Sequence, residues 1–583
     1  MHLDRALLTG VSLALPLLSI AAPSAERLRA HTAELSSDAY EGRAPGTRAE
    51  EKTVNYLTEQ FRSIGLQPGN PDGTFIQDVH LVGLTTTGSL SFDARGESLT
   101  PEPINDFVAG TRQLAPRVEL NDSELVFVGY GVVAPEYDWD DFKGVDVTGK
   151  TVVMLVNDPP VTTPDGKLDD TIFRGRAMTY YGRWTYKYES ALAHGAAACL
   201  IIHETGPAGY PFAVLSGNWG REEFDLRDSG GNSGRLAMEG WITWDFAKRL
   251  FAAAGHDLAA LKAAAVRRDF RPVPLNATAN VQLDVTMRDV ASRNVAGLLK
   301  GSDPKIQDEL IIYSAHWDHL GRDERLSGDQ IYNGALDNAS GIAVMLEVAR
   351  NLAELPRAER PRRSILFLAV TAEEQGLLGS RYYAQNPLYP LTKTIANINI
   401  DGANIYAPTR DIEIVGSGST TIEDIAEPIA ARQGRVLLPD SQPEKGFFYR
   451  SDHFEFAKVG VPAFYPEAGR EPLEGPPDLI DRRREEYTAK HYHKPSDEIS
   501  PAWDFNAVAQ DTQFLLDVGL ALANRDEWPQ WKEGSEFKAR REAMLRKQRP
   551  RPRHSIASCC VSSCAGCSRR YRSYWSSLRR PSS

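Results

Sequence analysis

Six side chains that can bind metal ions or carry protons are spread over almost two hundred positions of this sequence. They are His316, Asp337, Glu373, Glu374, Asp401 and His493. Imidazole and carboxylate groups are ligands that zinc accepts, and a carboxylate that is not a ligand can take a proton from an attacking water. Each residue alone says little about function. Together they favour a site where two metal ions activate water for hydrolysis.

His316 follows the apolar run 310–315, which predicts a strand. Asp318 lies two positions on, so its carboxylate can accept the second imidazole N–H and fix the tautomer. Without the other motifs, a surface histidine would be the simpler interpretation.

Asp337 lies in the segment 333–341, which is rich in Asn, Gly, Ala and Ser. Small neighbours allow two ions to approach one carboxylate, so Asp337 is the natural bridging ligand. An ordinary helix N-cap is the alternative interpretation, because aspartate also suits that position.

Glu373 and Glu374 follow the apolar run 365–370. Two adjacent carboxylates leave a strand with different orientations, so one can bind metal while the other faces the attacking water. The second carboxylate would take a proton from that water and pass it to the leaving amine. Alternatively, paired glutamates at a helix start only favour the helix dipole.

From residue 294 the pattern alternates between strands and helices. Strands are predicted at 309–315, 364–370 and 394–400, and helices at 341–355 and 374–385. This alternation predicts a parallel or mixed sheet flanked by helices, with ligands bound outside the carboxyl ends of the strands. His316, the glutamate pair and Asp401 fall at those ends.

The region before residue 294 has a different character. Thr47 and Glu50 have capping-box spacing and begin an amphipathic helix that should end at Gly65. Short apolar strands with Gly, Pro and Asp turns then indicate a separate β-rich module over 121–275. The aromatic stretch 180–188 is interpreted as part of its core.

Composition limits the class of protein. With 583 residues and 42% apolar content, the chain can bury a large core in several domains. Its net charge of −12 argues against nucleic acid as a partner. An apolar run at 6–22 predicts a signal peptide over 1–21, with an uncleaved anchor as the alternative. We therefore expect an exported protein, periplasmic or secreted, without stable membrane insertion.

Cysteines separate the body from the C-terminal tail. Cys199 stands alone before residue 559, whereas four cysteines cluster at 559–567 among Arg, Ser and Pro. Such a cluster can bind zinc or form disulfides, but the composition favours a disordered basic tail over 536–583.

At this point the chain resembles the bacterial leucyl aminopeptidase and aminopeptidase Y family, in the superfamily of glutamate carboxypeptidase II and the transferrin receptor. The resemblance covers residues 28–531. Its motifs are SAHWD at 314–318, NGALDNASG at 333–341, TAEEQG at 371–376, NIDG at 399–402 and YHKPSD at 492–497. It implies a zinc exopeptidase fold, with a mixed, mostly parallel sheet between helices.

The resemblance also implies a role for each site residue. One zinc ion would be held by His316, Asp337 and Asp401, and the second by Asp337, Glu374 and His493. Glu373 matches the general base.

Two further assignments rest on family motifs. His493 is preferred over His491 because the pattern reads Tyr-His-x-Pro-x-Asp. Tyr449, preferred over Phe448, falls near a tyrosine that stabilises the tetrahedral intermediate, and His453 is expected to be structural.

The β-rich module is similar to the protease-associated insert of these enzymes, through residues 128–135, 138–141 and 147–150. Its implied role is to shape access to the cleft. The expected division is a signal peptide (1–21), the N-terminal part of the peptidase domain (22–120), the insert (121–275), the dizinc peptidase domain (276–535) and the tail (536–583).

The resulting expectation is an exported enzyme with two zinc ions that removes N-terminal residues from peptides. A carboxypeptidase or dipeptidase of the same fold is the first alternative, and residues 482–484 (Arg-Arg-Arg) offer a basic pocket for a terminal carboxylate. A glutaminyl cyclase would use one zinc ion. A receptor-like binding protein would be expected to lack ligands. The oligomeric state is not indicated.

Overall fold

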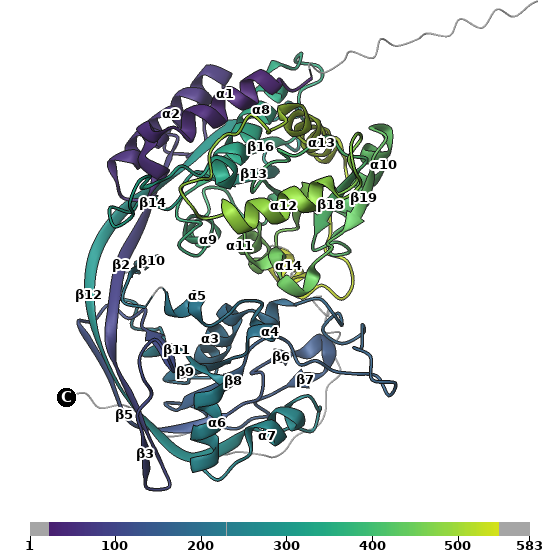
Figure 1. Ribbon diagram of the computed structural model, residues 1–583. Helices are drawn as coiled ribbons and strands as arrows, with labels where there is room; N and C mark the ends of the chain where they lie inside the picture. Colours follow the sequence, from purple (N-terminus) through teal and green to yellow (C-terminus); the bar gives the residue numbers. More distant parts are fainter. Residues whose placement is uncertain (1–21, 218, 229, 547–583) are drawn as a thin grey trace, which may run out of the picture.

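The computed structural model describes residues 22–217, 219–228 and 230–546. The expected signal peptide and the cysteine cluster lie outside the described residues. The chain forms two lobes joined by two long antiparallel strands, β2 (Ile76–Ala94) and β12 (Val273–Leu299) (Figure 1). These strands pair from Ile76 with Val295 to Ala94 with Ala277, so they run through both lobes.

The first lobe is built on a mixed sheet in the order β19-β18-β20-β17-β13-β16-β12, in which β13 is parallel to both β16 and β17. This arrangement confirms the predicted α/β fold with a mostly parallel sheet between helices. The strands of the first lobe are β1 (Gln67–Pro68), β13 (Leu310–His316), β14 (Gly321–Arg322), β15 (Ile331–Tyr332), β16 (Ser364–Val370), β17 (Thr394–Asn399), β18 (Asp411–Val415), β19 (Val436–Pro439) and β20 (Ala463–Ala468). Of these, β14 and β15 pair with each other in a separate sheet. Its helices are α1 (Ala25–Leu35), α2 (Arg48–Ile64), α8 (Gly341–Glu354), α9 (Leu378–Gln385), α10 (Ile422–Arg432), α11 (His453–Lys458), α12 (Leu479–Lys490), α13 (Phe505–Asn524) and α14 (Lys538–Arg546), with short helical segments η1 (Asp38–Arg43), η4 (Ala335–Ser340), η5 (Pro443–Lys445) and η6 (Phe447–Tyr449).

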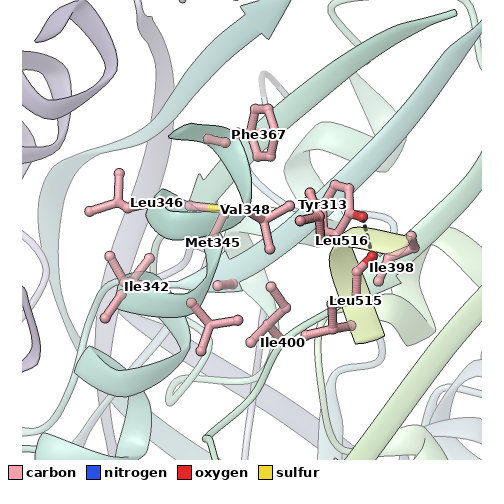
Figure 2. Close-up of a cluster of buried hydrophobic side chains, with 14 of the residues drawn as sticks. Tyr313, Ile342, Met345, Leu346, Val348, Phe367, Ile398, Ile400, Leu515 and Leu516 are labelled. Carbon is pink, nitrogen blue, oxygen red and sulfur yellow. Dashed lines mark hydrogen bonds between the residues drawn. The ribbon is translucent and has the colours of Figure 1, made fainter. Parts of the chain in front are cut away.

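Helices cover both faces of this sheet, which explains the uninterrupted apolar runs of its strands. Ile311 and Tyr313 of β13 face a core shared with α1, α2, α8, α10 and α13, whereas Leu310 and Ile312 face a core shared with α9 and α11. Figure 2 shows the first core, where the Tyr313 hydroxyl donates to the Leu515 carbonyl at 2.7 Å. The sheet is thereby fixed against α8 and α13.

The second lobe continues the sheet through β5, β8, β9 and β11, which are parallel, and ends at the antiparallel strand β4. Its strands are β3 (Glu97–Leu99), β4 (Phe107–Gly110), β5 (Arg117–Phe127), β6 (Val133–Ala134), β7 (Trp139–Asp140), β8 (Thr151–Leu155), β9 (Ala198–His203), β10 (Glu222–Leu226) and β11 (Met238–Thr243). Its helices are α3 (Trp184–Ala193), α4 (Thr205–Ala208), α5 (Ala213–Ser216), α6 (Trp244–Ala253) and α7 (Leu258–Ala265), with η2 (Pro135–Tyr137) and η3 (Tyr180–Gly182).

Three local features differ from the sequence analysis. The second lobe begins before residue 121, because Leu90 and Phe92 pack in its core. The capping box at α2 does not form, because the Thr47 hydroxyl donates to the Ala44 carbonyl. Residues 536–546 are not disordered, since α14 lies there and its Arg541 donates to the backbone of β17. Among the described residues, no helix combines the length and apolar character needed to cross a bilayer.

Candidate metal centre

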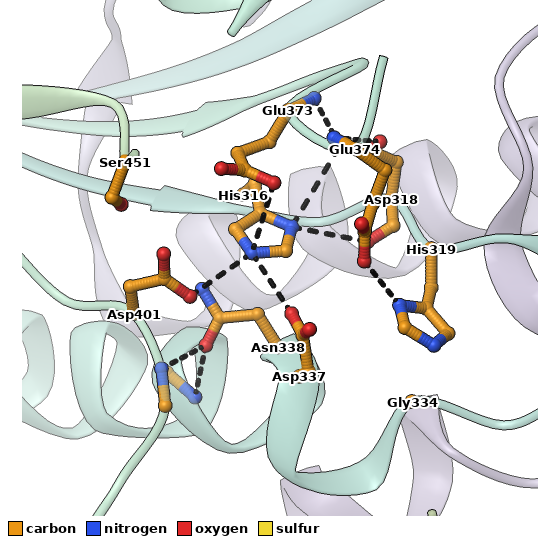
Figure 3. A network of polar contacts seen from close by, with 12 residues as sticks. His316, Asp318, His319, Gly334, Asp337, Asn338, Glu373, Glu374, Asp401 and Ser451 are labelled. Carbon is orange, nitrogen blue, oxygen red and sulfur yellow. Dashed lines mark hydrogen bonds and ion pairs between the residues drawn. The ribbon is translucent and has the colours of Figure 1, made fainter. Parts of the chain in front are cut away.

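The first lobe brings the predicted site residues to one edge of its sheet. His316 ends β13, the glutamate pair follows β16, and Asp401 follows β17. Parallel strands deliver their carboxyl ends to the same edge, so these side chains meet although they lie up to 85 positions apart (Figure 3). Asp337 reaches the edge from η4, and His493 from the loop after α12.

The histidines and carboxylates form two groups that share Asp337. His316 Nε2 lies 3.2 Å from both Asp337 Oδ1 and Asp401 Oδ1. His493 Nε2 lies 3.2 Å from Asp337 Oδ2 and 3.1 Å from Glu374 Oε2. Each oxygen of Asp337 therefore faces a different histidine, which is the geometry of a carboxylate between two cations.

Glu373 lies at the edge of the first group. Its Oε2 is 3.9 Å from His316 Nε2, and its carboxylate, His316 and Asp401 offer ligand atoms within 4.8 Å of one another. Glu373 is thus placed to ligate an ion or to move a proton beside one.

A histidine that the sequence analysis did not select borders the second group. His319 is buried, and its Nδ1 lies 2.5 Å from Glu374 Oε1. The other ring nitrogen, Nε2, has no hydrogen-bond partner among the described residues. In the sequence, His319 is marked only by its position next to Asp318. A histidine at that position is typical of an ordinary loop, so the sequence alone did not indicate a role in the site.

Asp318 orients the site in two ways. Its backbone carbonyl lies 3.1 Å from His316 Nδ1, whereas its carboxylate Oδ1 is 3.8 Å away. The carboxylate instead accepts the backbone N–H groups of Glu373 at 3.1 Å and of Glu374 at 3.4 Å. The carbonyl therefore holds the imidazole, and the carboxylate fixes the turn that carries both glutamates.

The two adjacent glutamates have opposite protonation behaviour. Burial raises the pKa of Glu373 well above its usual value, and the charges of Asp401 and Glu374 reinforce this effect against the pull of His316. Burial and Asp337 would also raise the pKa of Glu374, but His493 and His319 outweigh them and bring it to about 2. Glu374 is therefore suited to remain ionised as a ligand, and the carboxylate of Glu373 is the stronger base of the two.

Buried polar groups behind the site hold its loops. The Arg43 guanidinium, which the sequence analysis did not single out, donates to the backbone carbonyls of Trp317, Asn333 and Gly334. The carboxylate of Asp497 accepts the backbone N–H of Asp337 at 3.2 Å. These contacts fix the loops that carry His316 and Asp337.

Tyr449 is not brought into this cluster. Its hydroxyl donates to Glu536 Oε1 at 2.8 Å, and its ring packs against Phe454 and Tyr180. Among the described residues, no contact joins Tyr449 to the histidines and carboxylates of the site. His491 lies beside Ser496, with its Nδ1 2.9 Å from that backbone carbonyl.

Comparison with known proteins gives a family match and partial relatives. Residues 294–516 match the family model described as Peptidase family M28. An aminopeptidase NAALADL1 from Mus musculus is 33% identical over 154 residues, which are 23% of this chain and 19% of that protein. Aminopeptidase YwaD from Bacillus subtilis is 29% identical over 179 residues, 29% of this chain and 34% of that protein. The matched segments thus span about a fifth to a third of these relatives. A solved aminopeptidase from Aneurinibacillus sp. strain AM-1 is 20% identical with a TM-score of 0.44, over 86% of this chain and 94% of that one.

Proposed function

We propose that the chain is an exported zinc aminopeptidase that hydrolyses N-terminal residues from peptides, because residues 294–516 match the model of peptidase family M28. The family and the aminopeptidase names of its relatives support a metallopeptidase. Export rests on the signal-like sequence of residues 1–21 alone.

The observation that carries the proposal is the position of Asp337 between His316 and His493, with one oxygen 3.2 Å from each imidazole. The donor set fits two zinc ions, because imidazole and carboxylate groups converge and the buried negative charge needs cations to offset it. His316, Asp337 and Asp401 would hold one ion, and Asp337, Glu374 and His493 the other. When bound, zinc lowers the pKa of water and polarises the scissile carbonyl.

Glu373 is the proposed general base. It is buried beside His316, and its raised pKa makes its carboxylate a stronger base than that of Glu374. Its carboxylate takes a proton from the attacking water and gives it to the leaving amine. The carboxylate of Asp318 positions Glu373 through the Glu373 backbone N–H.

A carboxypeptidase or dipeptidase is the alternative, and the three arginines that favoured it have different partners. Arg484 pairs with Glu413 at 3.3 Å, and Arg482 pairs with Asp478 at 3.2 Å. Arg483 donates to the Tyr406 carbonyl at 2.8 Å. Only Arg484 is therefore neutralised by a buried carboxylate, because the Arg482 pair is exposed and Arg483 bonds to a neutral carbonyl. The choice between the two enzymes rests on the aminopeptidase names of the relatives.

Three peptides of one sequence test the proposal: free, N-acetylated and C-terminally amidated. An aminopeptidase binds the free ammonium group through a charge-assisted contact, which is worth roughly 1.5 to 3 kcal/mol. The acetylated peptide should therefore be cleaved at least about tenfold more slowly, and the amidated one at nearly the rate of the free peptide. Equal cleavage of the acetylated peptide with a strict need for a free carboxyl end would contradict the aminopeptidase assignment.

A further inference from the structure

The second lobe contains a cavity of about 200 Å³ that the proposed chemistry does not use. It lies among β4, β10, β11, α3 and α5, and its wall includes the aromatic side chains of Trp184, Tyr188, Trp219 and Trp241. Trp241 and Tyr188 are buried, so they form a fixed floor. Large aromatic side chains are well suited to bind an apolar partner with little loss of conformational entropy.

The same wall carries a compact set of charges. Arg112 lies 2.9 Å from Glu223 and 3.8 Å from Glu239, and its side chain is 23% exposed. Both glutamates and Arg112 line the cavity. An aromatic floor beside charged groups that retain some exposure suits a peptide, which brings an apolar side chain together with polar backbone groups.

Two of the elements that line the cavity, α5 and β10, lie on the side of the second lobe that faces the first. Figure 1 shows α5 and β10 at that side, with β10 reaching toward α9 of the first lobe. On β10, Asp225 lies 3.4 Å from Arg381 of α9, and Arg381 Nη2 donates to the Gly376 carbonyl at 2.9 Å. Glu223, in the cavity wall, is two residues before Asp225 on the same strand, or about 7 Å. A short series of contacts, through Asp225 and Arg381, therefore links the wall of the cavity to the turn that carries Glu373 and Glu374.

We propose that this cavity is a distal subsite for a large apolar or aromatic side chain of the peptide substrate. The inference rests on the proposed peptidase function. A peptide that leaves the metal centre in an extended conformation advances about 3.3 Å per residue, so a side chain several residues beyond the cleaved bond can reach the second lobe. The subsite would make the enzyme prefer long peptides with such a residue at one distal position.

Gly110 supplies a direct test because it lines the cavity and has free space around it. A Cβ built on Gly110 meets no atom within 4 Å, and its φ is not in the left-handed region, so Gly110→Leu adds volume without strain. Gly206 in α4 has the same free space but does not line the cavity, which makes Gly206→Leu the matched control. Trp184→Ala removes part of the wall and provides a second variant.

The experiment compares kcat/KM for a leucine anilide with kcat/KM for ten-residue peptides in which one phenylalanine is moved from position 3 to position 10. The wild-type protein and Gly206→Leu should prefer one distal position by at least about tenfold over the others. Gly110→Leu and Trp184→Ala should lose that preference and retain wild-type activity on the anilide. Binding of the preferred peptide to Glu373→Gln, with and without Gly110→Leu, measures the same contact without turnover.

Each outcome bears on one of the two proposals. Turnover of the anilide without any positional preference in the wild-type protein overturns the subsite and leaves the peptidase assignment standing. A preference that survives in both Gly110→Leu and Trp184→Ala also overturns it. Absence of turnover with every substrate contradicts the proposed function, and binding of each peptide of the series to the wild-type protein and to Gly110→Leu then decides the subsite alone.

Discussion

His319 Nδ1 lies 2.5 Å from Glu374 Oε1, so a buried imidazole supports the carboxylate that faces His493. Groups that hold a metal ligand in place typically contribute about 10-fold to 100-fold to metal affinity. We predict that His319→Ala weakens zinc binding by a factor in this range at the Glu374 site and leaves the His316 site unchanged. Competition with a zinc chelator measures both affinities. Unchanged affinity at both sites would show that His319 has no role in metal binding.

Substitution of each of the two adjacent glutamates should affect turnover and metal content differently. Glu373→Gln should lose nearly all turnover and keep its metal content and melting temperature, because the substitution removes a proton carrier and retains the shape. Glu374→Gln should lose metal from one site, since an amide is a weaker ligand than a carboxylate. Metal analysis beside kcat separates the two effects. The reverse pattern would exchange the roles of the two residues.

His493 and His491 form a matched pair within one loop. His493→Ala should release one zinc ion, because its Nε2 faces both Asp337 and Glu374. His491→Ala should be close to neutral, since its Nδ1 bonds to Ser496 and its ring stacks on Tyr487, and neither residue is a proposed ligand. The zinc content of each variant after gel filtration shows which of the two histidines is a metal ligand. Loss of metal from His491→Ala alone would mean that the ligand had been misplaced.

Arg381 should hold the turn that carries Glu373 and Glu374 in place against the second lobe. It pairs with Asp225 at 3.4 Å and with Glu455 at 3.6 Å, and both carboxylates are at most 6% exposed. Breaking such a pair from one side costs about 3 kcal/mol or more in stability. Arg381→Gln should therefore lower the melting temperature and reduce kcat with metal content unchanged.

The control for Arg381 is Arg410→Gln, which removes an exposed ion pair with Glu471. It should leave both stability and kcat close to wild type. If Arg381→Gln behaves like this control, the contact between the lobes does not position the turn.

Much of the first lobe could be predicted from sequence because its strands are buried on both faces. The run 364–370 predicted β16 with the bounds that the structure shows. The following helix begins at Leu378 rather than at residue 374, because residues 373 and 374 form a turn capped by Asp318. The hydrogen bond from the Glu373 N–H to Asp318 joins residues 55 positions apart, so no local sequence pattern predicts it.

The extent of the second lobe and the positions of Tyr449 and His319 were harder to predict for physical reasons. β2 and β12, with 19 and 27 residues, continue through both lobes, so no break in pattern marks the boundary. Tyr449 was expected at the site, but its hydroxyl bonds to Glu536, in a segment whose composition indicated disorder. The position of His319 likewise depends on a contact with Glu374 that only the folded chain creates.

Zinc titration of metal-free protein tests the shared role of Asp337 most directly. Protein stripped with a chelator should be inactive and should regain full activity as zinc approaches two equivalents per chain. Asp337→Asn should bind both ions weakly, because the substitution affects both groups at once. Full activity at one equivalent, or activity that survives exhaustive chelation, would contradict a two-zinc centre built around Asp337.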